Sequence, residues 1–302
     1  MEIGVCAKFS QEQLARLTRG AGGLPVRLFA EDAACDCEIV FGNPEASIVS
    51  ANTKLRWMQL ESVGFGEYVG LDWMRPEGRV TVTNLAGFFA DPVAETALAG
   101  ILALYRGIDV LVRFQSEGHW VGDPLRTRLR SLKGATVVLV GQGAINRRLA
   151  ELLAPFRCSI TPITRGSPAS VLDEALAGAD LVVCTAPDTT ETRGMFDAAR
   201  LARLPAAAIF CNFGRGSILD EDALADALDA GRLSGAVIDV TRQEPLPFGH
   251  RFWTTPNLIL TQHSGGGTAD ELDRKIDLFL ANLARFRAGA PLEGVVDFSR
   301  GY

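Results

Sequence analysis

The sequence has no apolar run long enough to cross a bilayer and no excess of basic residues. Its longer apolar stretches, such as residues 97–105, fall far short of the roughly 20 residues that a transmembrane helix needs. Lys and Arg number 30 against 36 Asp and Glu, a formal net charge of −6 at pH 7. Binding to nucleic acid through its phosphates requires a basic surface. The composition therefore argues against a membrane protein and against a nucleic-acid partner.

Histidine and cysteine are also scarce and scattered, at 3 and 6 residues. Cys35 and Cys37 form a C-x-C pair, which is neither a C-x-x-C redox motif nor a complete zinc ligand set. The first ten residues, MEIGVCAKFS, lack the basic start and apolar core of a secretory signal. We therefore expect no metal site, and reduced, mostly buried cysteines in a cytoplasmic protein.

Short apolar runs alternate with segments of helical period along the whole chain, which predicts an α/β fold with mostly parallel sheets. The 302 residues, 47% apolar and 22% charged, are enough for two domains with buried cores. Glycine, at 31 residues, indicates many tight turns or close backbone approaches to a ligand. The expected strands are residues 3–9, 26–29, 37–41, 57–62 and 80–83, and then 135–140, 158–163, 180–184, 207–212, 235–240 and 258–261.

Two long helices bracket the second group of strands. Asp91-Pro92 predicts the start of one that continues to about residue 112, with Asp as the cap and Pro at the first helical position. The T-A-D-E motif at residues 268–271 matches a capping box and predicts a second, ending near residue 286. The chain then leaves a first domain, builds a second and returns. We expect a discontinuous substrate domain (residues 1–90 plus 272–302) and a dinucleotide-binding domain (residues 91–271).

A glycine-rich turn follows the expected strand at residues 135–140. It reads Gly141-Gln142-Gly143-Ala144-Ile145-Asn146 and precedes an amphipathic helix. The first glycine permits the tight turn, and the second lets the backbone approach a pyrophosphate at the start of the helix. The alternative is an ordinary glycine turn. Asn146 departs from the Gly or Ala usual at the third position, so we expect the helix to lie slightly further from the sheet.

The end of the next expected strand bears on the choice of cofactor. It is followed by Thr164-Arg165-Gly166, with no carboxylate to accept hydrogen bonds from the ribose hydroxyls. An arginine at this point can pair with a 2′-phosphate instead. The sequence therefore favours NADP(H), with NAD(H) possible. The alternative is that Arg165 is a solvated surface charge.

Polar residues follow three later strands of the same expected sheet. Arg215 comes after the strand at 207–212, Asp239 and Glu244 end and follow the strand at 235–240, and His263 follows the strand at 258–261. Ligands of parallel sheets bind beyond the carboxyl ends of the strands. An arginine can hold a carboxylate, an imidazolium can donate a proton to a ketone, and a carboxylate can keep that imidazole oriented and charged. The set suits reduction of a 2-oxo acid, although each residue alone has a structural alternative.

The sequence resembles the D-isomer-specific 2-hydroxyacid dehydrogenases over nearly its whole length. The stretch EPLPFGHRFW is most similar to the glyoxylate/hydroxypyruvate reductase branch, many of whose members prefer NADPH. The resemblance is densest in LRWMQLESVGFG (55–66), VTNLAGFFADPVAETAL (82–98), LKGATVVLVGQGAI (132–145), TAPDTTETRGMF (185–196), residues 211–240 and EPLPFGHRFWTTPNLILTQHSGG (244–266).

This resemblance implies two Rossmann- or flavodoxin-like domains with the active site in the cleft between them, and usually a homodimer. It implies that Arg215 binds the substrate, a small 2-oxo or 2-hydroxy acid, that Glu244 is the carboxylate partner and that His263 is the acid/base. The backbone amides of Val63 and Gly64 would receive the substrate carboxylate. The implied cofactor-binding positions are Gly141, Gly143, Ala144, Ile145, Thr164, Arg165, Pro187, Phe213, Gly214, Asp239, beside the nicotinamide, and Gly265.

Two positions depart from the family pattern. Gln262 stands where a Pro is usual, which leaves the backbone before His263 freer, and Gly66 replaces a frequent Asp in the substrate loop. Formate dehydrogenases share the scaffold but typically carry Gln where this chain has Glu244. A nucleotide-sensing, corepressor-like binding protein without significant turnover is the alternative from another class. The complete Arg, Glu and His set and the lack of long disordered tails argue against it.

Overall fold

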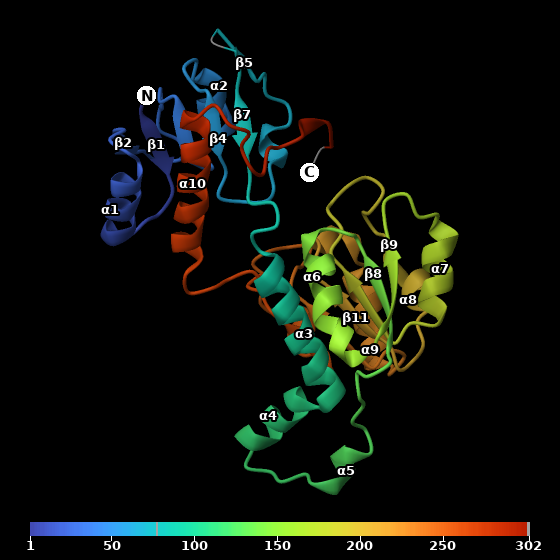
Figure 1. Ribbon diagram of the computed structural model, residues 1–302. Helices are drawn as coiled ribbons and strands as arrows, with labels where there is room; N and C mark the ends of the chain where they lie inside the picture. Colours follow the sequence, from blue (N-terminus) through green and yellow to red (C-terminus); the bar gives the residue numbers. More distant parts are fainter. Residues whose placement is uncertain (77, 301–302) are drawn as a thin grey trace. The chain divides into compact units, whose positions relative to one another are not determined.

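The computed structural model describes residues 1–76 and 78–300 (Figure 1). The chain divides into two compact units, which we call unit 1 (Met1–Ala86 and Thr268–Tyr302) and unit 2 (Gly87–Gly267). Both divisions lie four residues before the boundaries expected from the sequence, at 86 against 90 and at 267 against 271. Unit 1 contains both ends of the chain.

Unit 1 is built on a five-stranded parallel sheet in the order β2-β1-β3-β4-β7. The short antiparallel pair β5 and β6 lies outside this sheet and was not expected from the sequence. The strands of unit 1 are β1 (Ile3–Cys6), β2 (Val26–Leu28), β3 (Ile39–Gly42), β4 (Trp57–Gln59), β5 (Met74–Arg75), β6 (Gly78–Arg79) and β7 (Thr81–Thr83). Its helices are α1 (Gln11–Gly20), α2 (Ala46–Ala51), η1 (Gly66–Tyr68), α10 (Glu271–Arg287) and η5 (Phe298–Arg300).

Helix α10 returns from unit 2 and packs its aromatic face on this sheet. The Phe279 ring stacks on Phe41 and on Trp57, with centroids 4.5 and 5.0 Å apart. All three side chains are fully buried, and such aromatic pairs contribute about 0.5–1.5 kcal/mol beyond the area that they bury. Helix α10 is therefore an integral part of the core of unit 1.

Unit 2 is built on six parallel strands in the order β13-β12-β11-β10-β8-β9. Strand β8 has β9 on one side and β10 on the other, so the strand order reverses at β8. Ligands of open parallel sheets bind beyond the carboxyl ends of the strands at such a point. The strands are β8 (Thr136–Val140), β9 (Ser159–Ile163), β10 (Leu181–Cys184), β11 (Ile209–Asn212), β12 (Gly235–Ile238) and β13 (Leu258–Leu260). The predicted α/β fold with parallel sheets is confirmed.

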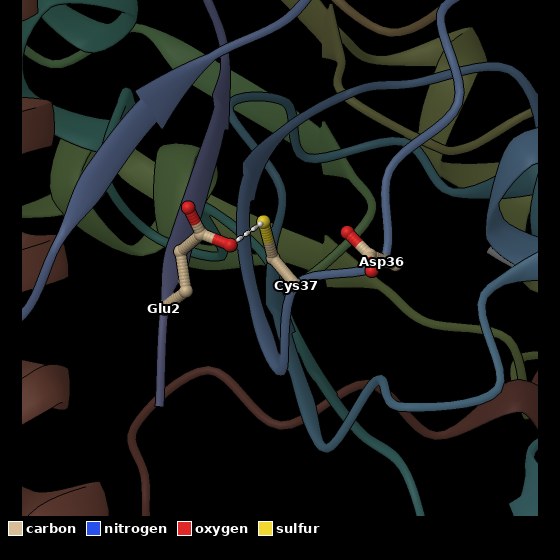
Figure 2. A group of neighbouring side chains, drawn as sticks. All are labelled: Glu2, Asp36 and Cys37. Atoms are coloured by element: carbon tan, nitrogen blue, oxygen red, sulfur yellow. Dashed lines mark hydrogen bonds between the residues drawn. The ribbon is translucent and has the colours of Figure 1, made fainter.

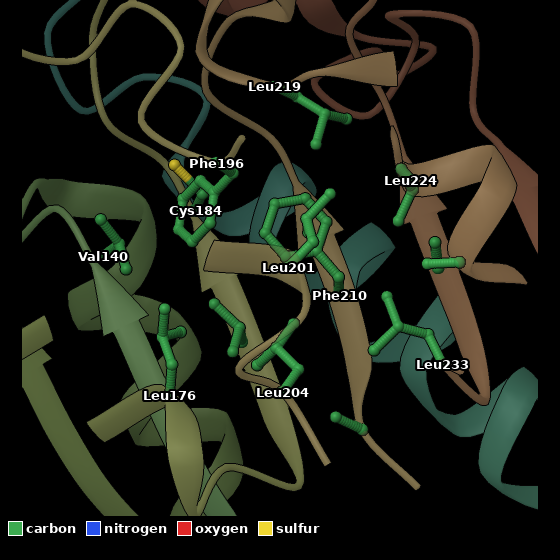
Figure 3. Packing of buried hydrophobic residues seen from close by; sticks show 14 of the residues in the cluster. Val140, Leu176, Cys184, Phe196, Leu201, Leu204, Phe210, Leu219, Leu224 and Leu233 are labelled. Carbon is green, nitrogen blue, oxygen red and sulfur yellow. The ribbon is translucent and has the colours of Figure 1, made fainter. Parts of the chain in front are cut away.

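Two hydrophobic clusters cover the two faces of this sheet. One joins it to α3 and α6, and the other, shown in Figure 3, contains Leu176, Phe196, Phe210 and Leu224. Fully burying each such side chain stabilises the fold by about 1.5–3 kcal/mol. The helices of unit 2 are α3 (Ala90–Arg106), α4 (Ile108–Ser116), α5 (Asp123–Arg126), α6 (Ala144–Leu153), η2 (Ala154–Phe156), α7 (Ala169–Ala177), α8 (Ala198–Leu201), η3 (Gly216–Ile218), α9 (Glu221–Asp229) and η4 (Arg251–Trp253).

The expected helix at 91–112 is two helices, because Gly107 adopts a left-handed φ of +63° and ends α3 at Arg106. Its expected cap was also wrong. Phe89 is the N-cap residue, and Asp91 lies in the first turn, where its carboxylate pairs with Arg148 at 2.6 Å.

The capping box expected at 268–271 does not form. Asp270 is the N-cap residue of α10 and makes no side-chain cap, while Glu271 pairs with Lys275 at 2.8 Å. In the described chain, every helix falls short of the length and hydropathy that a bilayer span requires.

Candidate active site

The glycine-rich turn after β8 has the geometry of a phosphate cradle. Gly141 has φ +92°, and a Cβ there would lie 3.2 Å from the backbone of Thr185 and Ala186, so only glycine fits without strain. Gly143, the N-cap of α6, faces open space and has no side chain to cap the helix. Among the described residues, no acceptor pairs with the backbone N–H groups of residues 143–146. The turn therefore offers free N–H donors at a helix start, which is what a pyrophosphate requires.

Asn146 is accommodated within the helix–sheet interface by hydrogen bonds. Its side chain is fully buried, and Nδ2 lies 3.1 Å from Val140 O and 2.7 Å from Gly141 O. The amide thus fastens α6 to the end of β8. Two buried oxygens beside the turn, Asn146 Oδ1 and Thr185 Oγ1, have no hydrogen-bond partner within residues 1–76 and 78–300. A bound dinucleotide would bring polar groups to this place, so the turn fits the cofactor that the sequence implies.

The end of β9 is open to solvent and carries no carboxylate. Thr164 and Arg165 are both exposed, and Thr164 N donates to Ser167 Oγ at 3.0 Å. The hydrogen bond from Thr189 is the main cause that lowers the pKa of Glu191, and the charge of Arg165 adds to it. Arg165 therefore lies within electrostatic reach of the loop after β10 and presents its positive charge at the end of β9.

The loops that follow β10 and β11 are in backbone contact. A Cβ at Gly214 would lie 2.4 Å from Ala186 O, so no larger residue fits there. The buried Phe213 donates its amide to Cys184 O at 2.8 Å. Pro187 is half-buried next to this contact, and its carbonyl accepts from Thr192 Oγ1 at 2.6 Å. Three of the expected cofactor positions, Pro187, Phe213 and Gly214, therefore lie in one pair of contacting loops.

Glu244 and His263, which come from loops after different strands, form a close pair. Glu244 Oε2 lies 2.6 Å from His263 Nδ1, and Thr241 N donates to Glu244 Oε1 at 2.9 Å. Partial burial raises the pKa of Glu244. The hydrogen bonds from His263 and Thr241 and the charges of His263 and Arg215 outweigh that effect, so the pKa is lowered. The carboxylate stays ionised at neutral pH and holds the imidazole by Nδ1, which leaves Nε2 for a substrate.

The buried carboxylate of Asp239 shapes the loop that carries His263. Asp239 Oδ1 accepts from Thr261 Oγ1 at 2.5 Å and from Gly265 N at 3.1 Å, on either side of the histidine. Gln262 and His263 have left-handed φ values of +52° and +54°. Proline, with φ fixed near −65°, cannot adopt the first of these. The Gln found here in place of the usual Pro therefore matches the backbone of this loop.

Arg215 presents a positive charge beside this pair. The side chain is exposed, and its guanidinium donates to Gly214 O at 2.7 Å. No salt bridge to Arg215 forms among the described residues, although its charge contributes to the lowered pKa of Glu244. The guanidinium has donors left for an anionic ligand such as a carboxylate.

Val63 and Gly64 lie in an exposed loop of unit 1. Their carbonyl oxygens accept from Asn84 Nδ2 and from Ser62 Oγ, each at 2.7 Å. Their own amides donate to no acceptor in the described part of the chain. These two N–H groups are available for a carboxylate, and their expected role stays a prediction.

A cluster of Glu2, Asp36 and Cys37 in unit 1 places three possible metal-ligand atoms within 4.8 Å of one another (Figure 2). Arg27 lies 3.0 Å from Asp36 and 3.7 Å from Glu2, and Lys54 lies 3.1 Å from Asp36, so both carboxylates are already paired with cations. Burial raises the pKa of the Cys37 thiol to about 12, although the hydrogen bond from Arg27 acts in the other direction. The thiol is protonated at neutral pH, so it is not the thiolate that binds metals, and the two carboxylates are held in ion pairs.

The Rossmann-like sheet, the phosphate cradle and the histidine–carboxylate pair define a class, the nicotinamide-dependent oxidoreductases. A model of the D-isomer specific 2-hydroxyacid dehydrogenase, NAD binding domain, matches residues 98–265, more than half of the chain and wholly within unit 2. The chain belongs to the D-isomer specific 2-hydroxyacid dehydrogenase family, whose members are NAD(P)-dependent oxidoreductases. The resemblance found in the sequence is confirmed.

The chain is also similar to individual proteins of this family. The glyoxylate reductase of Thermofilum pendens is 30% identical over 79% of this chain and 74% of its own. The mitochondrial formate dehydrogenase of Solanum tuberosum is 34% identical, but over 63% of this chain and 53% of its own. A D-isomer specific 2-hydroxyacid dehydrogenase from Xanthobacter autotrophicus Py2, crystallised with NADPH and MES, matches 100% of this chain and 99% of its own, with a TM-score of 0.80 and 26% identity. The two-domain Rossmann-like fold expected from the sequence is thereby confirmed.

Proposed function

We propose that this protein reduces a small 2-oxo acid of the glyoxylate or hydroxypyruvate type to the D-2-hydroxy acid, with NADPH favoured over NADH. The observation that carries the proposal is the 2.6 Å contact between His263 Nδ1 and Glu244 Oε2, formed beside the exposed charge of Arg215. The names of similar proteins, a glyoxylate reductase among them, support the substrate class.

In the proposed reaction Arg215 binds the substrate carboxylate, and the amides of Val63 and Gly64 add two donors. His263, oriented through Nδ1 by Glu244, donates the proton on Nε2 to the carbonyl oxygen. The ionised Glu244 stabilises the imidazolium that performs this donation. The bound nicotinamide supplies the hydride equivalent. The residues of the phosphate cradle and of the loops after strands β9 to β13 would hold it: Gly141, Gly143, Ala144, Ile145, Thr164, Arg165, Pro187, Phe213, Gly214, Asp239 and Gly265.

The direct test follows the nicotinamide absorbance with a panel of 2-oxo acids, in parallel with NADPH and NADH. Turnover that is faster with NADPH supports the reductase and ranks the substrates. If neither cofactor gives turnover while nucleotide binding is demonstrable, the sensing, corepressor-like function replaces the proposal. Turnover with formate and NAD alone would instead favour the activity of the Solanum tuberosum relative.

We expect Glu244→Gln to move the pH–rate profile of reduction. The lowered pKa of Glu244 means that the wild-type protein has an anion beside His263 throughout the neutral range. A neutral amide stabilises the imidazolium less, so the protonated form is lost at lower pH. The alkaline limb of kcat/KM should move by about one pH unit to lower pH.

The measurement is kcat/KM for the best 2-oxo acid between mildly acidic and alkaline pH. Glu174→Gln, which removes an exposed carboxylate from α7, is the control and should leave the profile in place. A Glu244→Gln profile that coincides with the wild type would contradict the pairing.

We expect Arg165→Ala to weaken the binding of NADPH about tenfold and that of NADH less than twofold. The 2′-phosphate, which only NADPH carries, loses one charge-assisted hydrogen bond of roughly 1.5 kcal/mol. The measurement is the KM of each cofactor at saturating 2-oxo acid. Arg203→Ala, which removes an exposed arginine after α8, serves as the control. Equal weakening of both cofactors would return Arg165 to the role of a surface charge.

We further propose that the protein is a cytoplasmic homodimer. Six free cysteines, five of them buried, support a reducing compartment. The dimer is supported only by the resemblance to the family, and size-exclusion chromatography with light scattering tests it.

A further inference from the structure

The turn that presents Glu244, residues 241–244, is held by two carboxylates through consecutive backbone amides. Thr241 N donates to Glu244 Oε1 at 2.9 Å, and Arg242 N donates to Glu221 Oε1 at 2.6 Å. Glu221 is the first residue of α9 and lies outside the proposed acid–base pair. The hydrogen bond from Arg242 N to Glu221 nevertheless fixes the Thr241–Arg242 peptide, which is next to the Thr241 amide that Glu244 binds.

The same peptide is seated against the segment that carries Arg215. A Cβ at Gly216 would lie 2.0 Å from Thr241 C and 2.3 Å from Arg242 N, so this peptide packs directly on the glycine backbone. Gly216 follows Arg215 in the chain. The turn is therefore clamped between a backbone contact on one side and a hydrogen bond to Glu221 on the other.

The carboxylate of Glu221 is itself restrained. His250 Nε2 lies 3.4 Å from Glu221 Oε2, and the Glu221 side chain is only 12% exposed. His250 Nδ1 accepts from Phe252 N at 3.2 Å, which leaves a ring proton on Nε2, facing the carboxylate. One oxygen of Glu221 thus faces the imidazole and the other accepts from the turn.

We propose that Glu221 is a positioning residue for the His263–Glu244 pair, and that His250 orients Glu221. Without the Glu221 acceptor, Arg242 N donates to water and the turn at residues 241–244 relaxes. Glu244 then shifts as well, because its carboxylate accepts from Thr241 N. A misplacement of about 1 Å can slow catalysis about 100-fold. Because the contact at Gly216 remains, a loss of about tenfold is expected.

This inference rests on the proposed function, so its test needs a readout that does not require turnover. The variants are Glu221→Ala, which removes the acceptor, and Glu221→Gln, which keeps an Oε1 acceptor for Arg242 N but removes the charge and turns an amide N–H toward the Nε2–H of His250. Asp222→Ala is the control on the same helical turn, where the side chain is 85% exposed. Thermal unfolding confirms that each variant is folded.

The first readout is the NMR titration of His263 in the protein without ligands. The chain has 3 histidines, and His263→Asn assigns the signal. The charged groups around this imidazole, Glu244, Asp239 and Arg215, are present in every variant. Glu221→Ala should lower the titration midpoint, and Glu221→Gln, which keeps the acceptor for Arg242 N, should lower it less. If both variants shift it equally, the distant charge explains the effect and the proposal is wrong.

The second readout is the kinetics of 2-oxo acid reduction. Glu221→Ala should lower kcat about tenfold with an unchanged KM for NADPH, and Glu221→Gln should recover part of the rate. The double variant with Glu244→Gln should be no slower than Glu244→Gln alone. Wild-type rates in Glu221→Ala would overturn the inference. If the wild-type protein itself is inactive, the proposed function fails, and the titration alone decides whether Glu221 positions the pair.

Discussion

Turnover of the His263→Asn variant is expected to fall about 10²–10⁴-fold, because the group that donates the proton in the proposed reaction is removed. Asparagine suits this position. His263 has a φ of +54°, and asparagine tolerates the left-handed region better than most residues, so the loop fastened by Asp239 keeps its conformation. The measurement is kcat for the best 2-oxo acid at the pH optimum of the wild type.

Nucleotide binding separates loss of chemistry from loss of structure in this variant. The phosphate cradle at residues 141–146 follows β8, whereas His263 follows β13, so NADPH should bind the variant with unchanged affinity, measured by its fluorescence. A kcat near the wild-type value would remove His263 from the mechanism. Joint loss of kcat and of NADPH binding would show instead that the loop has a structural role.

Arg215→Ala should lower kcat/KM for the 2-oxo acid about 10²–10³-fold. The exposed guanidinium is the cation proposed to hold the substrate carboxylate, and losing one partner of a hydrogen-bonded charge pair costs about 2–5 kcal/mol. Arg215→Lys keeps the charge without the forked donors, so it should recover only part of the loss.

The control for this charge is Arg232→Ala, which removes another exposed arginine of unit 2, just after α9. It should leave kcat/KM within twofold. If Arg215→Ala weakens the binding of NADPH as much as the binding of the 2-oxo acid, the arginine binds the cofactor and not the substrate.

The sheets were predictable because buried parallel strands are short apolar runs. Residues 135–140 and 207–212, for instance, contain β8 and β11. Helix starts were less predictable, since Thr268 and Asp91 have the right chemistry at the right spacing but do not adopt the cap geometry. The pair β5 and β6, two residues each, is too short to show a period.

The candidate site divides in the same way. Strand order and residue type pointed to Arg215, Glu244 and His263, and the structure places two of them 2.6 Å apart. The contact of Glu221 could not be predicted, because it joins a side chain to a backbone amide 21 residues away and leaves no motif. Supporting contacts made through the backbone are the part of a site that a single sequence conceals.

The glycines of the two units place different limits on how this protein could evolve. At Gly214 and Gly216 an added Cβ would collide with backbone within 2.4 Å, so these positions, on either side of Arg215, tolerate no side chain. At Gly64 and Gly66 an added Cβ would meet nothing within 4 Å. New side chains can appear in that loop at little cost to the fold. Under the proposed function, substrate preference can therefore change there without disturbing the backbone packing at Gly214 and Gly216.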